Sequence, residues 1–215
     1  MEQDPIVDLA FPVTAGRVPM DHGYALYSSL VEPVPELHLA SWLGVHPLSG
    51  KKLNDSTLLL TPMSAVTLRL PGSKAAIALQ LAGRRIRIGG EIFLLGNPTL
   101  RPLEPSTSLF SRQVAIRLTR PPTSSDGALD VPAFREAFAA AAQRQLAALG
   151  VRGALRIVSK RQIAVKGQCI VAFAVEVSDL DRDDGLKLQA RGIGGKRRMG
   201  CGVFRPSRIA GGAET

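Results

Sequence analysis

The stretch DVPAFREAFAAAAQRQLAAL, residues 130–149, is the clearest helix signal in this 215-residue chain. Asp130 suits an N-cap position, Phe134 and Phe138 are four residues apart, and Gly150 follows as a stop signal. Short apolar segments with the character of strands precede and follow this helix, and a second, shorter helix is expected at 181–189. The expected strands are 113–119, 155–158, 162–166, 168–177 and 203–206. The second half of the chain therefore predicts strands and helices in the split βαβ order.

The first half of the chain predicts the same order of elements. A helix that starts near Pro19 and Asp21 is stopped by two prolines, and a second, Ala-rich helix covers 74–81. The expected strands cover 6–13, 37–45, 57–61, 66–70, 85–88 and 91–95. The expected fold class is α+β: two tandem ferredoxin-like (βαββαβ) domains, residues 1–105 and 111–215, joined by a linker at 97–111 and carrying a C-terminal glycine-rich loop.

Composition excludes several classes of protein. With 45% hydrophobic and 21% charged residues, the chain can build a core, which argues against global disorder. No apolar run approaches the roughly 18 residues that cross a bilayer, and the acidic start, residues 1–5, lacks the basic region of a secretory signal. Two cysteines, Cys169 and Cys201, are too few for a disulfide framework or a structural zinc site. We expect a reduced, cytoplasmic protein without membrane contact, metal or cofactor.

Positive charge is concentrated in the second half of the chain. Residues 1–110 hold nine Lys and Arg against nine Asp and Glu, whereas residues 111–215 hold 18 against nine. This bias favours a polyanion as partner, although a basic surface that only serves solubility gives the same pattern. Aromatic residues are few, with seven Phe, two Tyr and one Trp, which argues against a sheet of base-stacking rings and favours recognition of an RNA backbone by arginine.

The stretch GIGGKRRMGCGVF, residues 192–204, combines glycines with three consecutive cations. It lacks the Ser or Thr and the following helix of a Walker phosphate loop, and Arg197 stands where a dinucleotide fingerprint needs its third glycine. Two interpretations stay open: a glycine-rich turn with solvent-facing arginines, or a clamp on an RNA backbone. The candidate RNA-binding residues are Gly192, Gly194, Gly195, Lys196, Arg197, Arg198, Gly200 and Gly202, with Arg161 and Lys166 upstream.

This stretch resembles the glycine-rich loop of the CRISPR repeat-RNA endoribonucleases, the Cas-six family of the RAMP superfamily. Residues 18–27, VPMDHGYALY, are similar to the start of that family's first helix, and residues 37–47, LHLASWLGVHP, resemble a myxobacterial-type subgroup. The resemblance covers most of the chain, and the tandem ferredoxin-like layout is that family's fold.

The resemblance implies an activity and a partner. The activity is metal-independent cleavage of CRISPR precursor RNA within its repeats, in which a ribose 2′-OH attacks the adjacent phosphate and leaves a 2′,3′-cyclic phosphate; the enzyme can stay bound to the mature guide RNA. Because the loop alone does not separate cleaving from non-cleaving relatives, a second function stays open: a non-cleaving RAMP subunit that holds guide RNA beside other subunits of a CRISPR effector complex. A nucleotide-binding metabolic enzyme is disfavoured by the failed phosphate-loop comparisons.

Proton transfer near neutral pH points to histidine, of which the chain has three. The resemblance places a general base in the region of His38, which we rank first. His22, at the start of the first helix, is a second candidate for catalysis or else a capping residue, and His46, before a proline, is a turn residue or a third candidate. Tyr27 and Tyr24 are expected to pack in the core or to hydrogen-bond the scissile phosphate.

Overall fold

The computed structural model describes residues 4–119, 121–123 and 130–207. The chain divides into two compact units, of which the first consists of Met1–Leu103, Gln162–Ile170 and Lys196–Cys201, and the second of Glu104–Arg161, Val171–Gly195 and Gly202–Thr215. The domain boundaries 1–105 and 111–215 stay a prediction. The structure adds that two short segments from the second half of the chain, including the three consecutive cations, pack with the first unit.

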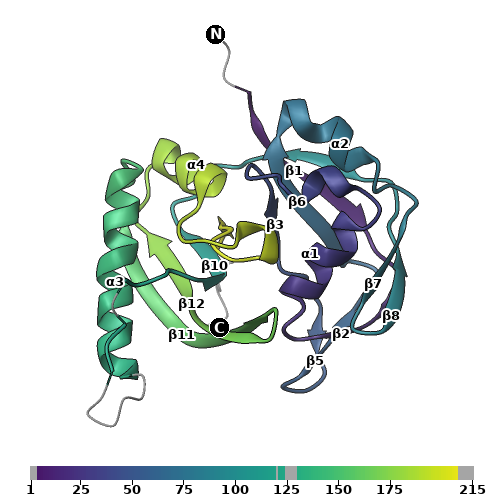
Figure 1. The fold of residues 1–215 in the computed structure, drawn as a ribbon. Helices are drawn as coiled ribbons and strands as arrows, with labels where there is room; N and C mark the ends of the chain where they lie inside the picture. Colours follow the sequence, from purple (N-terminus) through teal and green to yellow (C-terminus); the bar gives the residue numbers. More distant parts are fainter. Residues whose placement is uncertain (1–3, 120, 124–129, 208–215) are drawn as a thin grey trace, which may run out of the picture. The chain divides into compact units, whose positions relative to one another are not determined.

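The first unit is built on a four-stranded sheet (Figure 1). Its spatial order is β3-β6-β1-β9, and all neighbouring strands are antiparallel. Its elements along the chain are β1 (Ile6–Pro12), α1 (Gly23–Val31), β3 (Gly44–Val45), β6 (Ala65–Pro71), α2 (Ala75–Leu79) and β9 (Thr99–Pro102). Counted along the chain, the sheet order is second, third, first, fourth, with one helix in each crossover, which is the ferredoxin-like arrangement.

The second unit repeats this topology. Its sheet has the order β11-β12-β10-β13. Its elements are β10 (Leu109–Val114), α3 (Val131–Ala148), β11 (Ala154–Val165), β12 (Gln168–Ser178), α4 (Arg182–Arg191) and β13 (Arg205–Pro206). The prediction of two tandem ferredoxin-like folds is therefore confirmed.

Additional elements decorate the first unit. A small sheet of order β2-β5-β4 and a hairpin of β7 and β8 lie outside the four-stranded sheet. Their bounds are β2 (Gly16–Pro19), β4 (Lys51–Lys52), β5 (Thr57–Leu60), β7 (Arg85–Ile88) and β8 (Glu91–Leu94). Three 3₁₀ turns complete the described elements: η1 (Pro35–Leu37), η2 (Gly72–Lys74) and η3 (Arg197–Met199).

Each unit has its own core. In the first, Phe11 of β1 and Leu68 of β6 are fully buried together with Leu30 of α1. In the second, Phe138 of α3 packs on Phe173 of β12 with ring centroids 4.7 Å apart. None of the helices among the described residues is long and apolar enough to cross a membrane. Of the acidic start used against a secretory signal, residues 1–3 lie outside the described residues.

The helix predicted at 130–149 is α3, and it is capped by Asp130 at its start and by Leu149 at its end. The side chain of Asp130 accepts a hydrogen bond from the backbone N–H of Ala133 at 3.0 Å, so the N-cap prediction is confirmed. The same capping is seen in α4, where Asp181 accepts from the N–H of Asp184 at 2.7 Å.

Several sequence predictions are wrong. Strand β10 covers Leu109–Val114, so only residues 113 and 114 of the expected strand 113–119 are in a strand. The other two failures lie where burial does not follow a period of two. Residues 37–45 form η1 and turns, with only Gly44–Val45 in a strand, because the buried Leu37, Ala40 and Leu43 recur every third residue. The expected linker 97–111 contains β9 and the start of β10. Strand β9 ends in a proline, which is tolerated because β9 is an edge strand. All of its residues are exposed, so its sequence lacks the alternation of apolar and polar residues that predicts a strand.

Candidate active site

His22 is part of the frame of the first unit. It is the N-cap residue of α1 and only 2% exposed. Its Nδ1 lies 2.9 Å from the carbonyl oxygen of Pro19, and its Nε2 lies 2.9 Å from the backbone nitrogen of Leu48. A neutral ring that donates from Nδ1 and accepts at Nε2 satisfies both backbone groups. Both ring nitrogens are thus engaged away from solvent, which suits a structural role.

His46 is also tied into the frame. Its Nε2 donates to Asp8 Oδ1 at 3.3 Å, and Arg69 grips the same carboxylate with Nε at 2.8 Å and Nη2 at 2.7 Å. Arg69 is only 1% exposed and is the direct cross-strand partner of Asp8. Burial alone would raise the pKa of Asp8, but the hydrogen bonds and charges of His46 and Arg69 outweigh it and hold that pKa well below its usual range.

His38 differs from both, because its side chain is exposed. It is the C-cap residue of η1, directly after the buried Leu37, rather than the start of a strand. Its carbonyl oxygen accepts a hydrogen bond from the hydroxyl of Tyr27 at 2.8 Å and another from Arg198 Nη1. The backbone that carries this imidazole is therefore held from two directions.

Arg198 connects the cationic segment to this point. Its Nη1 donates to the hydroxyl of Tyr27 at 3.2 Å, and its guanidinium carbon lies 5.3 Å from the centre of the Tyr27 ring. Contact with the ring face adds a cation–π attraction to the hydrogen bonds. Tyr27 itself is buried on α1, so it links Arg198 and His38 rather than facing solvent.

The other two cations of the segment lie in different surroundings. Lys196 is exposed and adopts a left-handed backbone conformation at φ 62°. Arg197 is half-buried, and burial lowers its pKa to about 10, with a further contribution from the charge of Arg69. It stays protonated at neutral pH, so the segment keeps all three positive charges.

The glycines of residues 192–204 do not offer free amides to a ligand. Their N–H groups all donate within the protein: Gly192 to Leu188 O, Gly194 to Gln145 Oε1, Gly195 to Ala115 O, Gly200 to Arg197 O and Gly202 to Gln113 O. The interpretation of this stretch as an RNA clamp can therefore not rest on the N–H groups of these five glycines. A Cβ at Gly202 would lie 2.0 Å from the carbonyl oxygen of Ile193, so close backbone packing is what this glycine allows.

The two upstream candidates lie on the β11–β12 hairpin. Arg161 is exposed on β11, and Lys166 is exposed in the turn that follows, at φ 50°. Beside Lys166, the N–H of Ala164 donates to Asp21 Oδ2 at 2.6 Å, which joins this part of the hairpin to the chain just before α1. Arg161 belongs to the second unit and Lys166 to the first.

The sequence analysis did not identify the ion pair between Asp8 and Arg69, which joins β1 and β6 in the four-stranded sheet of the first unit. Asp8 and Arg69 are each the single charged residue of a mostly apolar strand, IVDLAFP and AVTLRLP. Lone opposite charges at the centres of two apolar strands are a signal for a cross-strand pair, because a buried charge needs a partner. Among the described residues, no group of three or more His, Cys, Asp and Glu side chains could hold a metal ion.

Comparison with known proteins identifies the family of this chain. The family described as Cas6 Crispr matches residues 7–209. The CRISPR-associated endonuclease Cas6 of Myxococcus xanthus (strain DK1622) is 40% identical over 200 residues, which cover 93% of this chain and 81% of the relative. The chain belongs to the Cas6 family.

Solved structures show the same fold at low sequence identity. A Cas6-related protein from Pyrococcus furiosus gives a TM-score of 0.65 at 14% identity, over 95% of this chain and 99% of the other. A RAMP protein described as binding different RNA substrates gives 0.65 at 15% identity, over 93% and 98%. The shared fold therefore extends over nearly the full length of this chain.

Proposed function

We propose that this Cas6-family protein is an endoribonuclease that cleaves CRISPR precursor RNA within its repeats to give guide RNA, and that it stays bound to the product. In this reaction a ribose 2′-OH loses its proton and attacks the adjacent phosphorus. The bond to the 5′-oxygen of the next nucleotide breaks, and that oxygen takes up a proton. The products are a 2′,3′-cyclic phosphate and a 5′-OH. Since the nucleophile belongs to the RNA, the protein has to move protons and stabilise charge, and no metal is required.

His38 is the proposed general base. It is the one exposed imidazole of the three, which all lie among the described residues. His22 uses both ring nitrogens inside the protein, and His46 donates to Asp8, so neither is as free to exchange a proton with RNA. Tyr27 acts as a positioning residue through its hydrogen bond to the His38 carbonyl.

Arg198 and Lys196 are the proposed phosphate contacts. The proposal rests above all on the contacts of Arg198, because they join the cationic segment to Tyr27 and to the backbone of His38. A guanidinium fixed at that point can stabilise the charge that develops on the phosphorane, while Lys196 adds an exposed charge beside it.

The test is single-turnover cleavage of repeat RNA in the presence of EDTA. We expect His38→Ala to lower the rate about 10²–10⁴-fold with nearly unchanged RNA affinity, because it removes proton transfer and no phosphate contact. Glu36→Gln, an exposed change in the same 3₁₀ turn, is the matched control and should cleave like the parent.

Two results would count against this assignment. If the parent protein binds repeat RNA and never cleaves it, the non-cleaving RAMP subunit is the correct function. If His38→Ala cleaves at the parent rate, the base is a different group and the exposed imidazole has no catalytic role.

A further inference from the structure

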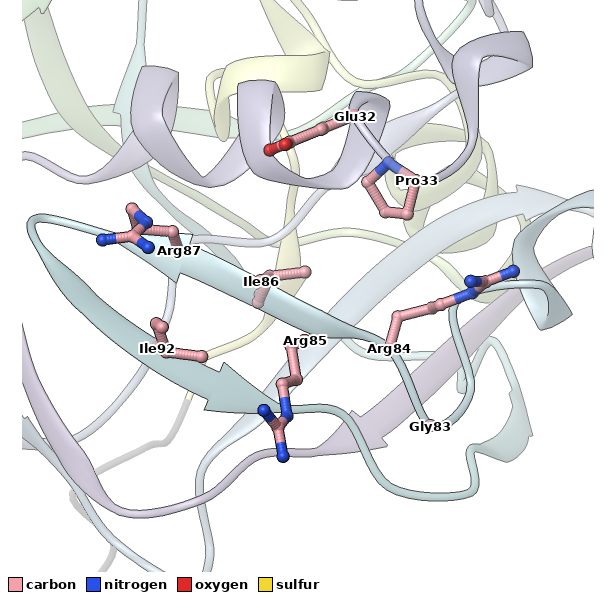
Figure 2. A pocket seen from close by; sticks show the side chains of 8 residues that line it. All are labelled: Glu32, Pro33, Gly83, Arg84, Arg85, Ile86, Arg87 and Ile92. Carbon is pink, nitrogen blue, oxygen red and sulfur yellow. The ribbon is translucent and has the colours of Figure 1, made fainter.

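A groove of about 580 Å³ lies in the first unit, between the end of α1 and the β7–β8 hairpin. Figure 2 shows Glu32 and Pro33 from the end of α1 on one side of it, and the arginines of the hairpin on the other. It is lined by Glu32, Pro33, Gly83, Arg84, Arg85, Ile86, Arg87 and Ile92. Its volume lies in the range of pockets that hold a small organic ligand.

The groove carries an excess of positive charge. Three arginines, Arg84, Arg85 and Arg87, line it, against one carboxylate, that of Glu32. Among the described residues none of the three arginines forms an ion pair, and Arg84 uses its Nε only for the carbonyl oxygen of Gln80 at 3.3 Å. These cations sit in the half of the chain whose total charge is zero, so composition alone gives no sign of them.

The hairpin presents charge and apolar surface together. Ile86 is buried, and the alternation of a strand leaves Arg85 and Arg87 exposed on the opposite face. In the hairpin register Arg85 pairs with Leu94 and Arg87 with Ile92, which are 46% and 55% exposed. A nucleotide matches this surface, since its phosphate suits a guanidinium and its base or ribose suits an aliphatic side chain.

The spacing of the arginines favours a chain of anions over a single anion. Figure 2 shows the three guanidinium groups spread along the strand and not gathered at one point. Positions two apart on a strand are separated by about 6.7 Å, so Arg85 and Arg87 can contact successive phosphates of one extended strand. A single small anion would use only one of them.

The groove and the candidate active site share helix α1. Tyr27 lies within α1, and Glu32 is its C-cap residue, five residues later. At 1.5 Å per residue the two positions are roughly 8 Å apart along the helix axis. An RNA strand held at Arg198, which contacts Tyr27, can therefore reach the groove within a few nucleotides around the end of α1.

We propose that this groove binds single-stranded RNA that flanks the cleaved phosphate, through phosphate contacts with Arg84, Arg85 and Arg87 and an apolar contact with Ile92. The proposal rests on the proposed function, which supplies the RNA. It assigns an RNA contact to a part of the first unit that lies outside the glycine-rich segment.

The test compares three RNAs: a minimal repeat, and the same repeat with a single-stranded extension on its 5′ or its 3′ side. Affinity is measured by fluorescence anisotropy at several salt concentrations for the parent, for Arg84→Gln/Arg85→Gln/Arg87→Gln, and for Arg17→Gln/Lys74→Gln/Arg101→Gln. The last variant is the matched control, because it removes the same charge from the same unit outside the groove. A thermal melt of each variant confirms folding, and Ile92→Asp serves as a second variant that repels phosphate without removing an arginine.

We expect the groove variant to bind one extended RNA roughly tenfold more weakly than the parent does, and to lose about 0.7 of log–log salt slope per lost phosphate contact. Affinity for the minimal repeat and its cleavage rate should stay at the level of the control variant. Equal losses for minimal and extended RNA, or losses equal to those of the control, overturn the groove assignment. So does a groove variant that binds all three RNAs normally but no longer assembles with a protein partner.

The two proposals fail in different ways. Failure of the groove leaves cleavage of the minimal repeat intact. Failure of the proposed function abolishes cleavage in the parent, while the difference between extended and minimal RNA still reports on the groove.

Discussion

His22 and His38 show how differently one side chain can be used within a single unit. His22 is buried at the start of α1 and joins the backbone of Pro19 to that of Leu48. His38 is exposed at the end of η1, and only its carbonyl oxygen is held, by Tyr27 and Arg198. In the first case the ring is part of the frame, and in the second the frame holds the backbone and leaves the ring accessible. Accessibility, and not residue type, separates the two.

The glycine-rich segment divides in the same way. The N–H groups of its five glycines, which were candidate RNA contacts, donate hydrogen bonds to backbone carbonyl oxygens and to the side chain of Gln145. Its cations, by contrast, are distributed between an exposed position at Lys196, a half-buried one at Arg197 and the contact of Arg198 with Tyr27. The glycines thus shape the backbone, and the cations are the part of the segment that we propose for contact with RNA.

The largest effect that would sharpen this comparison is expected from Arg198→Ala. The change removes both the clamp on the His38 carbonyl and a positive charge at the phosphate, so cleavage should slow about 10²–10³-fold. Arg198→Lys should recover only part of the rate, because the lysine ammonium lacks the planar guanidinium that lies over the Tyr27 ring while its Nη1 donates to Tyr27 and His38. Single-turnover cleavage measures both variants, and a parent-like rate for Arg198→Ala would separate the segment from the chemistry.

His22→Ala tests the other side of the comparison. Two buried backbone groups lose their partner, so the free energy of unfolding should fall by about 2–4 kcal/mol in urea titrations. Cleavage by the folded variant, measured well below its melting temperature, should stay close to that of the parent. A stable His22→Ala protein with no activity would move the general base to the start of α1.

Two alanine substitutions within the glycine-rich segment form a matched pair. Gly202 has φ 65° and no room for a Cβ, so Gly202→Ala should cost about 1–3 kcal/mol of stability in thermal melts. Gly195 has open space where a Cβ would stand, so Gly195→Ala should change stability by less than about 0.5 kcal/mol. RNA affinity should be nearly unaffected in both folded variants, and a large loss in Gly195→Ala would assign an RNA contact to this glycine.

A further effect concerns stability in acid. Because the folded pKa of Asp8 is lowered by His46 and Arg69, its contribution to stability is present above its unfolded pKa of about 3.9 and is lost as pH falls below that value. One such group adds a slope of at most about 1.4 kcal/mol per pH unit in this window. In urea titrations between pH 5 and 3, the free energy of unfolding should fall less steeply with pH for Asp8→Asn than for the parent. An identical slope in both proteins would show that Asp8 does not contribute to the loss of stability in acid.

Much of the fold could be predicted from the sequence, where the local signal is strong. The helix at 130–149 has a capping residue and a stop, and core strands such as β1, β6 and β12 are runs of mostly apolar residues, so the signal for each lies in adjacent residues. The element order then leaves few topologies to consider. Strand β9 escaped because every one of its residues is exposed and its place on the sheet edge depends on pairing with β1.

The candidate site could be predicted only in part. His38, Tyr27 and Arg198 were recognisable as candidates, but nothing local to them indicates that Tyr27 and Arg198 meet at the His38 carbonyl. That contact joins segments far apart in the chain. The arginines that line the groove were not recognised either, because residues 1–110 hold equal numbers of basic and acidic residues and so show no excess of charge.

By itself, the sequence determined which residues are available for chemistry and in what order the helices and strands follow one another, since both depend on short-range properties of the chain. Only the tertiary structure decided which histidine is buried and which exposed, that the glycine amides are already occupied, and that Arg198 reaches the backbone of His38. Burial and long-range hydrogen bonds depend on what packs against a residue, and that is set by pairing between strands and helices that are remote in sequence.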